Sequence, residues 1–246
     1  MILIGILENG ENEFSYCISS LEQQSFTDWS LFTIRNKPNK QAHDTLYARF
    51  MQNKGKSDFF LKLDADMTLR HPNVLRDMVN TFDEDIAHIL AWVQDAPSGL
   101  NIPGVQMWRS DTVWEGSNEK LIVDYPPRIF GRSKILYDKK WVSHMSNPSD
   151  FQLFKYGIHK ALKSTQPDRK KKNLQKGLSH IAILNGIARR YFSQEDASKL
   201  IFSLIGALLI FTNKIRTIDY SGSIVKKLFQ EIFFEKSEFD RLTSQA

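Results

Sequence analysis

FFLKLDADMTL, residues 59–69, joins a run of large apolar side chains to two carboxylates one residue apart, Asp64 and Asp66. The apolar run is typical of a buried β-strand. Residues i and i+2 of an extended segment point the same way, so both carboxylates can face one ion. Paired negative charge at the end of a buried strand costs free energy unless a cation is bound there. The stretch therefore predicts a strand that ends in a cation site. The alternative is that the two carboxylates cap the following turn.

Strand and helix patterns alternate through the first half of the chain. Strands are expected at residues 2–7, 29–35, 59–63 and 86–93, with helices at 11–24, 40–55 and 72–82 between them. Alternation at this spacing predicts an α/β fold with a doubly wound, mostly parallel sheet. Ligands of such sheets bind beyond the carboxyl ends of the strands.

Polar residues follow the first three expected strands. Glu8 follows the first strand, Asn36 the second and Asp64 the third. Because parallel strands end at the same edge, we expect these three loops to converge on one crevice. Lys40 and His43 begin the helix after the second strand, on the same side. An ordinary exposed helix face is the alternative for both.

The chain also contains a second match to the paired-carboxylate pattern, Asp83-Glu84-Asp85. This segment follows a helix and precedes a strand, so it is expected at the opposite edge of the sheet. We predict that it is a solvated turn and use it as an internal control.

The pattern of elements changes after residue 95. Residues 94–105 contain two prolines and two glycines and predict a loop, and short strands are expected at 105–109 and 120–125. Helical spacing dominates from residue 146 onward. We therefore expect an α/β domain over residues 1–150 and a helical region over 151–246.

Composition excludes several classes of protein. The net charge of +5 is mild, and the basic run at 168–176 has no interleaved aromatic residues, so nucleic-acid binding is not supported. We expect a solvated linker there, with contact to anionic lipid as the alternative. The most apolar run, at 200–212, is shorter than the roughly 20 residues that a membrane-spanning helix needs. The single cysteine forms no internal disulfide, and a cytoplasmic protein is expected, with a peripheral contact at the inner face of the membrane as the alternative.

Four segments carry a resemblance to a known family: ILIGIL (2–7), SLFTIR (30–35), FLKLDADM (60–67) and HMSNPSDFQLFKYGIHKALK (144–163). Over roughly residues 1–165 the chain resembles a family 2-type glycosyltransferase with the GT-A fold. The resemblance implies that the DxD motif, Asp64 and Asp66, binds Mn²⁺ or Mg²⁺ at the diphosphate of a nucleotide-sugar donor. It also implies sugar transfer to a glycan or lipid-linked acceptor, with inversion. Leu7-Glu8-Asn9 and Arg35-Asn36 depart from the family pattern and leave the identity of the nucleotide open.

Further roles follow from the chemistry that this resemblance implies. The base that deprotonates the acceptor is expected to be Asp124, which ends an apolar run, with Glu115 as its competitor. Arg128 and Arg132 are candidates for phosphate contact. His144 lies in an irregular segment and is expected to complete the metal site. A hydrogen bond to the donor diphosphate and a purely structural role are its alternatives.

Two other functions stay open at this point. A nucleotidyltransferase also uses carboxylates and a metal on an α/β sheet, but it usually has a Gly-rich phosphate loop with a basic residue. The corresponding segment, ILENGENE, contains only Gly10 and no Lys or Arg. The other possibility is a catalytically silent nucleotide-binding module of the same fold, which loss of Asp64 or Asp66 would have favoured.

Overall fold

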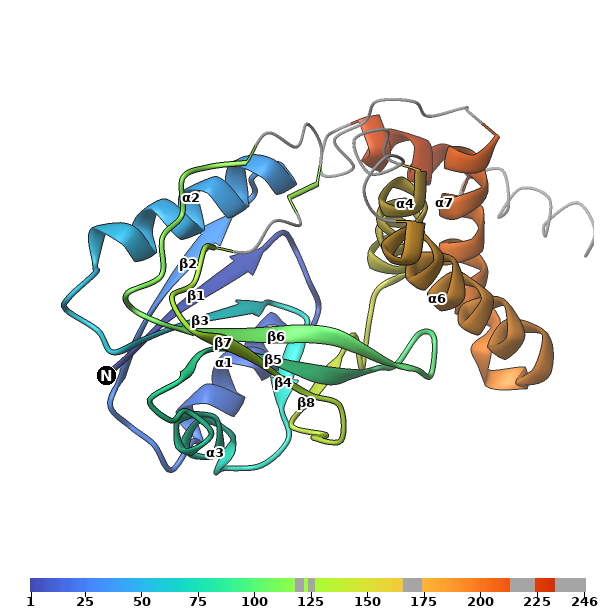
Figure 1. Ribbon diagram of the computed structural model, residues 1–246. Coiled ribbons are helices and arrows are strands. Elements are labelled where there is room, and N and C mark those ends of the chain that lie inside the picture. Colours follow the sequence, from blue (N-terminus) through green and yellow to red (C-terminus); the bar gives the residue numbers. More distant parts are fainter. Residues whose placement is uncertain (118–121, 124–126, 166–173, 213–223, 233–246) are drawn as a thin grey trace, which may run out of the picture. The chain divides into compact units, whose positions relative to one another are not determined.

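The structure is a computed structural model (Figure 1). It describes residues 1–117, 122–123, 127–165, 174–212 and 224–232. The chain divides into two compact units, Met1–Ser149 and Asp150–Ala246. The first unit is α/β and the second is helical.

The first unit is built on an eight-stranded sheet with the order β2-β1-β3-β6-β5-β8-β4, and β7 pairs with β5. The strands are β1 (Ile2–Glu8), β2 (Trp29–Arg35), β3 (Phe59–Asp64), β4 (Met67–Leu69), β5 (Ile86–Asp95), β6 (Asn101–Arg109), β7 (Arg132–Leu136) and β8 (Val142–His144). The helices are α1 (Phe14–Glu22), α2 (Asn39–Gln52) and α3 (Val74–Asn80). Helix α2 covers one face of the sheet, whereas α1 and α3 lie on the other (Figure 1). The α/β class and the doubly wound arrangement are confirmed.

The sheet is mostly parallel, as predicted. β1 runs parallel to β2 and β3, and β5 runs parallel to β7 and β8. The pairs of β6 with β3 and β5, and of β4 with β8, are antiparallel. Because β6 is antiparallel to both of its neighbours, β5 points the same way as β3.

The expectation of a loop over residues 94–105 was wrong. β5 extends to Asp95 and β6 begins at Asn101, so most of this segment belongs to a hairpin. Pro103 lies within β6, beside the register shift between Ala91 and Trp92 of β5. Proline is tolerated in a sheet at such irregularities, where no ladder hydrogen bond is lost. In the strand expected at 120–125, the structure describes only residues 122 and 123, which form no strand.

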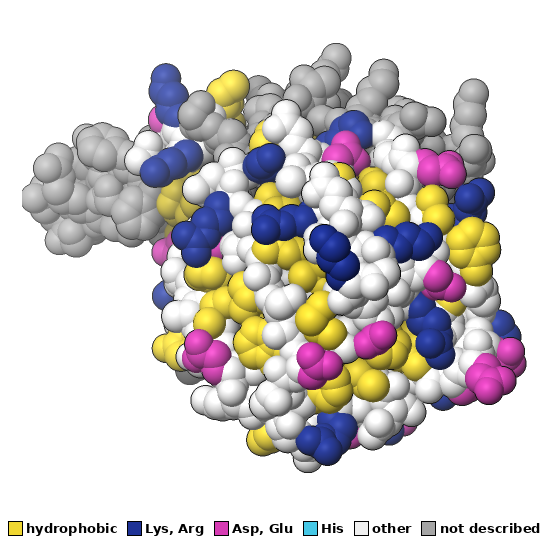
Figure 2. Space-filling model, turned by 90° about the vertical axis from the view of Figure 1, so that its left-hand side faces the viewer, with side chains coloured by type: hydrophobic (Ala, Val, Ile, Leu, Met, Phe, Trp, Pro, Cys, Tyr) yellow, Lys and Arg dark blue, Asp and Glu magenta, His cyan; other side chains and the backbone are white. Residues whose placement is uncertain are grey.

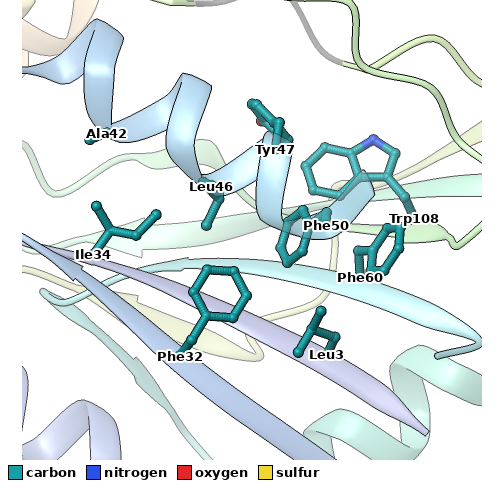
Figure 3. Packing of buried hydrophobic residues seen from close by; sticks show 9 residues of the cluster. All are labelled: Leu3, Phe32, Ile34, Ala42, Leu46, Tyr47, Phe50, Phe60 and Trp108. Atoms are coloured by element: carbon teal, nitrogen blue, oxygen red, sulfur yellow. The ribbon is translucent and has the colours of Figure 1, made fainter. Parts of the chain in front are cut away.

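A cluster of buried hydrophobic residues packs α2 against the sheet (Figure 3). Its buried members are Leu3, Phe32, Ile34, Ala42, Leu46, Tyr47, Phe50, Phe60 and Trp108. Phe50 of α2 stacks on Phe60 of β3, with ring centroids 4.8 Å apart. A Cβ added to Gly5 of β1 would lie 2.3 Å from Leu46 Cδ1, so glycine lets the helix approach the strand. Trp108 has no exposed surface and belongs entirely to this core.

The second unit contains α4 (Asp150–Thr165), α6 (Leu174–Ser193), the 3₁₀ helix η1 (Glu195–Leu200) and α7 (Ile201–Phe211), and residues 224–232 are also helical. The side of α4 that carries Phe154, Ile158, Ala161 and Leu162 is buried. Among the helices that the structure describes, none has the length and apolar character needed to cross a membrane.

The surface shown in Figure 2 carries charges of both signs. Several Lys and Arg side chains lie across the upper half of this face, and most of the Asp and Glu side chains lie below them, with apolar groups between.

His88 of β5 gives the first unit a pH-dependent stability. Its ring stacks on Trp108 at 5.3 Å, and its Nδ1 lies 3.0 Å from Ser133 Oγ. Burial lowers the pKa of His88 to about 4 from 6.5. Between these two pH values the unfolded chain binds a proton that the folded protein does not bind. Stability therefore falls as the pH falls from 6.5 to 4, by up to about 3 kcal/mol.

Urea unfolding at pH 7.5 and pH 4.5 tests this expectation, with His88→Phe as the matched variant. Phenylalanine keeps a ring on Trp108 and removes the titrating group. The variant is expected to lose less stability than the wild type between the two pH values. An equal loss would contradict the assigned role of His88.

Candidate functional site

The first three strands end side by side, as the sequence predicts. Leu7 of β1 lies opposite Asp64 of β3, and Glu8 lies opposite Arg35 of β2. The backbone N–H of Asn36 donates to the carbonyl of Glu8 at 3.0 Å. Asn36 has a φ of 52°, a left-handed conformation that Asn adopts more readily than most residues. The carboxyl ends of β1, β2 and β3 therefore form one edge.

Asp66 is the most informative residue at this edge. It lies in the short turn between β3 and β4, and its side chain is 15% exposed. Its Oδ2 lies 3.4 Å from His144 Nε2. Its Oδ1 is buried and, within the described part of the chain, accepts no hydrogen bond. A buried carboxylate oxygen without a donor is costly, so this atom marks a position suited to a cation.

His144 reaches Asp66 through the pairing of the strands. It ends β8, where it lies opposite Met67 of β4 on one side and Asp95 of β5 on the other. Its Nδ1 lies 2.6 Å from Oδ1 of Asp95, which is fully buried. Burial alone would lower the pKa of His144, but Asp66 and Asp95 raise it to about 10. At neutral pH, without another cation, an imidazolium therefore stands between the two carboxylates.

Asp64 is neutralised in a different way. Its Oδ1 lies 2.7 Å from Nζ of Lys62, whose side chain is only 9% exposed. Burial would raise the pKa of Asp64, but the charge and hydrogen bond of Lys62 hold it below its usual value, with smaller effects of His43 and His144. Sequence reasoning missed Lys62, although residues i and i+2 of a strand share a face.

Side chains of two helices approach Asp64 and Asp66. His43 is buried on α2, with Nδ1 2.9 Å from the carbonyl of Asn39, so the exposed-face alternative for His43 is wrong. Cys17 of α1 lies with Sγ 4.0 Å from the Asp64 carbonyl. Burial, together with Asp66 and Asp64, raises the pKa of the Cys17 thiol to about 12, so the thiol stays protonated.

Lys40 and Glu8 form local contacts near the same edge. Lys40 Nζ lies 3.0 Å from Asp44 Oδ2 and donates to the Ser117 carbonyl at 2.6 Å. Glu8 Oε2 lies 3.4 Å from Nε of Arg35. A ligand that binds to Lys40 or Glu8 would therefore have to replace these contacts.

The loop after β1 does not form a phosphate cradle. The backbone N–H of Gly10 donates to Glu8 Oε1 at 2.8 Å, and the N–H of Asn9 donates to Glu11 Oε2. Two backbone donors that a phosphate loop would direct at its ligand are therefore held by carboxylates. This arrangement disfavours a nucleotidyltransferase.

Three of the other predicted residues, Glu115, Arg128 and Arg132, form ion pairs, and Asp124 lies outside the described residues. Glu115 Oε1 and Arg128 Nη2 lie 3.5 Å apart, and both side chains are mostly exposed. Arg132 pairs with Asp85 at 3.2 Å, at the edge of the sheet where β5 begins, so it does not serve the site.

The internal control is confirmed as a turn. Asp83 Oδ1 accepts hydrogen bonds from the backbone N–H groups of Asp85 and Ile86, both at 3.0 Å. These bonds shape the chain before β5 begins, at the edge opposite to Asp66.

The residues at this edge are suited to a divalent cation whose remaining ligands come from a substrate. In the described ranges, no three His, Cys, Asp or Glu side chains are already arranged to hold a metal ion. Asp66 and His144 supply an oxygen and a nitrogen, and Asp66 Oδ1 has no donor there. Mg²⁺ and Mn²⁺ are commonly held by one or two carboxylates and completed by substrate phosphates. The pair suits such an ion, whereas Asp64 is engaged by Lys62.

Neither a protein-family model nor a curated protein matches the chain. Among solved structures, it is similar to S. aureus TarS 1–349 in complex with UDP-GlcNAc, with 14% identity, a TM-score of 0.40 and coverage of 85% of this chain and 81% of that chain. It covers only 44% of another TarS chain. It is also similar to the mannosyltransferase PcManGT from Pyrobaculum calidifontis in complex with GDP-Man and Mn²⁺, with 7% identity, a TM-score of 0.45 and coverage of 87% and 88%. A third structure is a glycosyltransferase involved in the glycosylation of the major capsid of PBCV-1, with 16% identity, a TM-score of 0.38 and coverage of 61% and 95%. These similarities are distant and fix neither the family nor the activity of this chain.

Proposed function

We propose that the chain is a glycosyltransferase that takes its sugar from a nucleotide-sugar donor and depends on Mn²⁺ or Mg²⁺. The observation that carries the proposal is the buried Oδ1 of Asp66 beside His144, which accepts no hydrogen bond from the residues that the structure describes. This atom lies at the edge where β1, β2 and β3 end, which is where doubly wound sheets bind their ligands.

Each residue of the site has a role in this proposal. Asp66 and His144 would hold the cation, which would supply positive charge against the negative charge that develops on the departing diphosphate. Asp64 stays ionised beside Lys62, whose ammonium adds positive charge at the same edge. Further donor contacts are assigned to Glu8, Asn36, Lys40, His43 and Arg128.

Transfer with inversion requires a base that removes the proton of the acceptor hydroxyl. We assign this role to Asp124, with Glu115 as its competitor. Asp124→Asn is expected to abolish transfer while sparing donor binding, because the base acts on the acceptor and not on the diphosphate. Turnover assays paired with donor-binding calorimetry test this. Turnover that persists in Asp124→Asn and disappears in Glu115→Gln would exchange the two roles.

The acceptor is proposed to be a glycan or a lipid-linked sugar, and the protein is proposed to be cytoplasmic. A peripheral membrane contact would involve the basic run at 168–176, and residues 168–173 of this run lie outside the described part of the chain. Flotation with vesicles that contain anionic lipid tests this contact.

Thermal-shift measurements with UDP-, GDP-, CMP- and dTDP-sugars, with and without Mn²⁺, test the proposed function. UDP-GlcNAc and GDP-Man are the first two compounds to try. We expect one donor class to raise the melting temperature only when Mn²⁺ is present, because Asp66 and His144 would hold the cation and the cation would supply charge that the diphosphate needs. Release of the nucleoside diphosphate in the presence of an acceptor then separates an enzyme from a silent binding module. If no donor stabilises the protein with Mn²⁺, the proposal is wrong.

A further inference from the structure

Asp95 is a buried carboxylate that the proposed chemistry has not yet used. It ends β5, has no exposed surface, and places Oδ1 2.6 Å from His144 Nδ1. On the other side of the same ring, Nε2 faces Asp66 at 3.4 Å. Asp95, His144 and Asp66 therefore form a line in which the imidazole joins a fully buried carboxylate to the proposed cation site.

We propose that Asp95 is a positioning residue that keeps a proton on His144 Nδ1, so that Nε2 is the nitrogen that gives up its proton and binds the cation at Asp66. This inference rests on the proposed metal site. An imidazole that donates its Nδ1–H to a carboxylate has a fixed tautomer and a more basic Nε2.

The backbone holds the two partners in register. Asp95 and His144 are paired residues of β5 and β8, and the Ala96 N–H donates to the His144 carbonyl at 3.0 Å. The Met145 N–H donates to the Asp66 carbonyl at 2.9 Å. Because the sheet fixes both ends of the line, the ring has little freedom to turn away.

The carboxylate of Asp95 is itself oriented by Ser98. Its Oδ2 accepts hydrogen bonds from the Ser98 backbone N–H, at 3.1 Å, and from the Ser98 hydroxyl. Because both Ser98 groups donate, the carboxylate must present an oxygen atom to Ser98. Oδ1 is therefore directed at His144, and rotation of the carboxylate would break both bonds.

The same constraint makes Asp95→Asn a sharp test. With the amide oxygen held by Ser98, the amide NH₂ of the variant faces His144, so Nδ1 must accept a hydrogen bond and gives up its proton to solvent. The ring is then neutral, with its proton on Nε2. ¹⁵N NMR of the imidazole ring is expected to show Nε2–H in the metal-free variant. Mn²⁺ affinity, measured by electron paramagnetic resonance with Mn²⁺ alone, is expected to fall by about 10- to 100-fold.

Ser98→Ala is the matched control, since it removes a donor from Oδ2 and keeps both the charge of Asp95 and its contact with His144. It is expected to keep the proton on Nδ1 and to bind Mn²⁺ within about twofold of the wild type. Wild-type protein titrated with diamagnetic Cd²⁺ supplies a readout that needs no variant. Nδ1 should stay protonated throughout while the Nε2 resonance shifts.

Two results would overturn the inference: an Asp95→Asn protein that keeps the Nδ1–H tautomer and wild-type Mn²⁺ affinity, or loss of the Nδ1 proton during the Cd²⁺ titration. Neither measurement contains a donor or an acceptor. A protein that meets both expectations but transfers no sugar would refute the proposed function and leave the role of Asp95 standing.

Discussion

Asp66→Asn is expected to abolish Mn²⁺-supported binding of the nucleotide-sugar and to lower kcat/KM by about 1,000-fold or more, which corresponds to several kcal/mol of lost transition-state stabilisation. The physical reason is that Asp66 Oδ1 is the buried oxygen that no donor in the described residues satisfies. An amide in its place brings no charge to hold the cation. Calorimetry with donor and Mn²⁺, followed by steady-state kinetics, measures both effects.

The variant should remain folded without the metal, because Asp95 still holds His144 at Nδ1 and the backbone of Asp66 still accepts from Met145. Asp83→Asn is the matched control. It alters the same pattern of paired carboxylates in a turn at the opposite edge of the sheet and should change neither binding nor kcat/KM. Undiminished Mn²⁺-supported donor binding in Asp66→Asn would remove Asp66 from the site.

Local patterns in the sequence predicted much of the first unit. The strands at 2–7 and 29–35 and the buried face of α2 were found because apolar spacing reports directly on which residues face the core. A strand at 105–109, within β6, was also predicted, but its place between β3 and β5 in the sheet was not. β6 pairs antiparallel with β3 and joins it to β5. The spacing of apolar residues along the chain predicts strands but not the order in which they pair.

The residues of the candidate site differ in the same respect. The position of Asp64 and Asp66 after a strand was predictable because an apolar run precedes them, and His144 was proposed with the help of a resemblance. Asp95 was missed, although it also ends an apolar run, because the expected strand stopped at residue 93. Its partner His144 lies 49 residues away, and only the pairing of β5 with β8 brings the two together.

In the helical unit, the largest expected effect on stability comes from Gly157→Ala. A Cβ at Gly157 of α4 would lie 1.8 Å from the carbonyl oxygen of Ser203 in α7. Because this atom belongs to the backbone, no change of rotamer relieves the overlap, and the two helices must separate. Separation also breaks the hydrogen bond from Ser203 Oγ to the Leu153 carbonyl, now 2.7 Å long. We expect a loss of about 3 kcal/mol or more in the free energy of unfolding.

Gly177→Ala on α6 is the matched control, since its added Cβ would have Ser164 O at 3.4 Å as its nearest neighbour, an ordinary contact distance. This variant is expected to gain about 0.5–1 kcal/mol, because alanine loses less backbone entropy than glycine in a helix. Urea unfolding followed by circular dichroism compares the two variants in the full chain. A loss of stability in Gly157→Ala and a gain in Gly177→Ala would separate the effect of close helix packing from that of helix propensity. If Gly157→Ala gained stability as Gly177→Ala does, the close approach of α4 to α7 would be refuted.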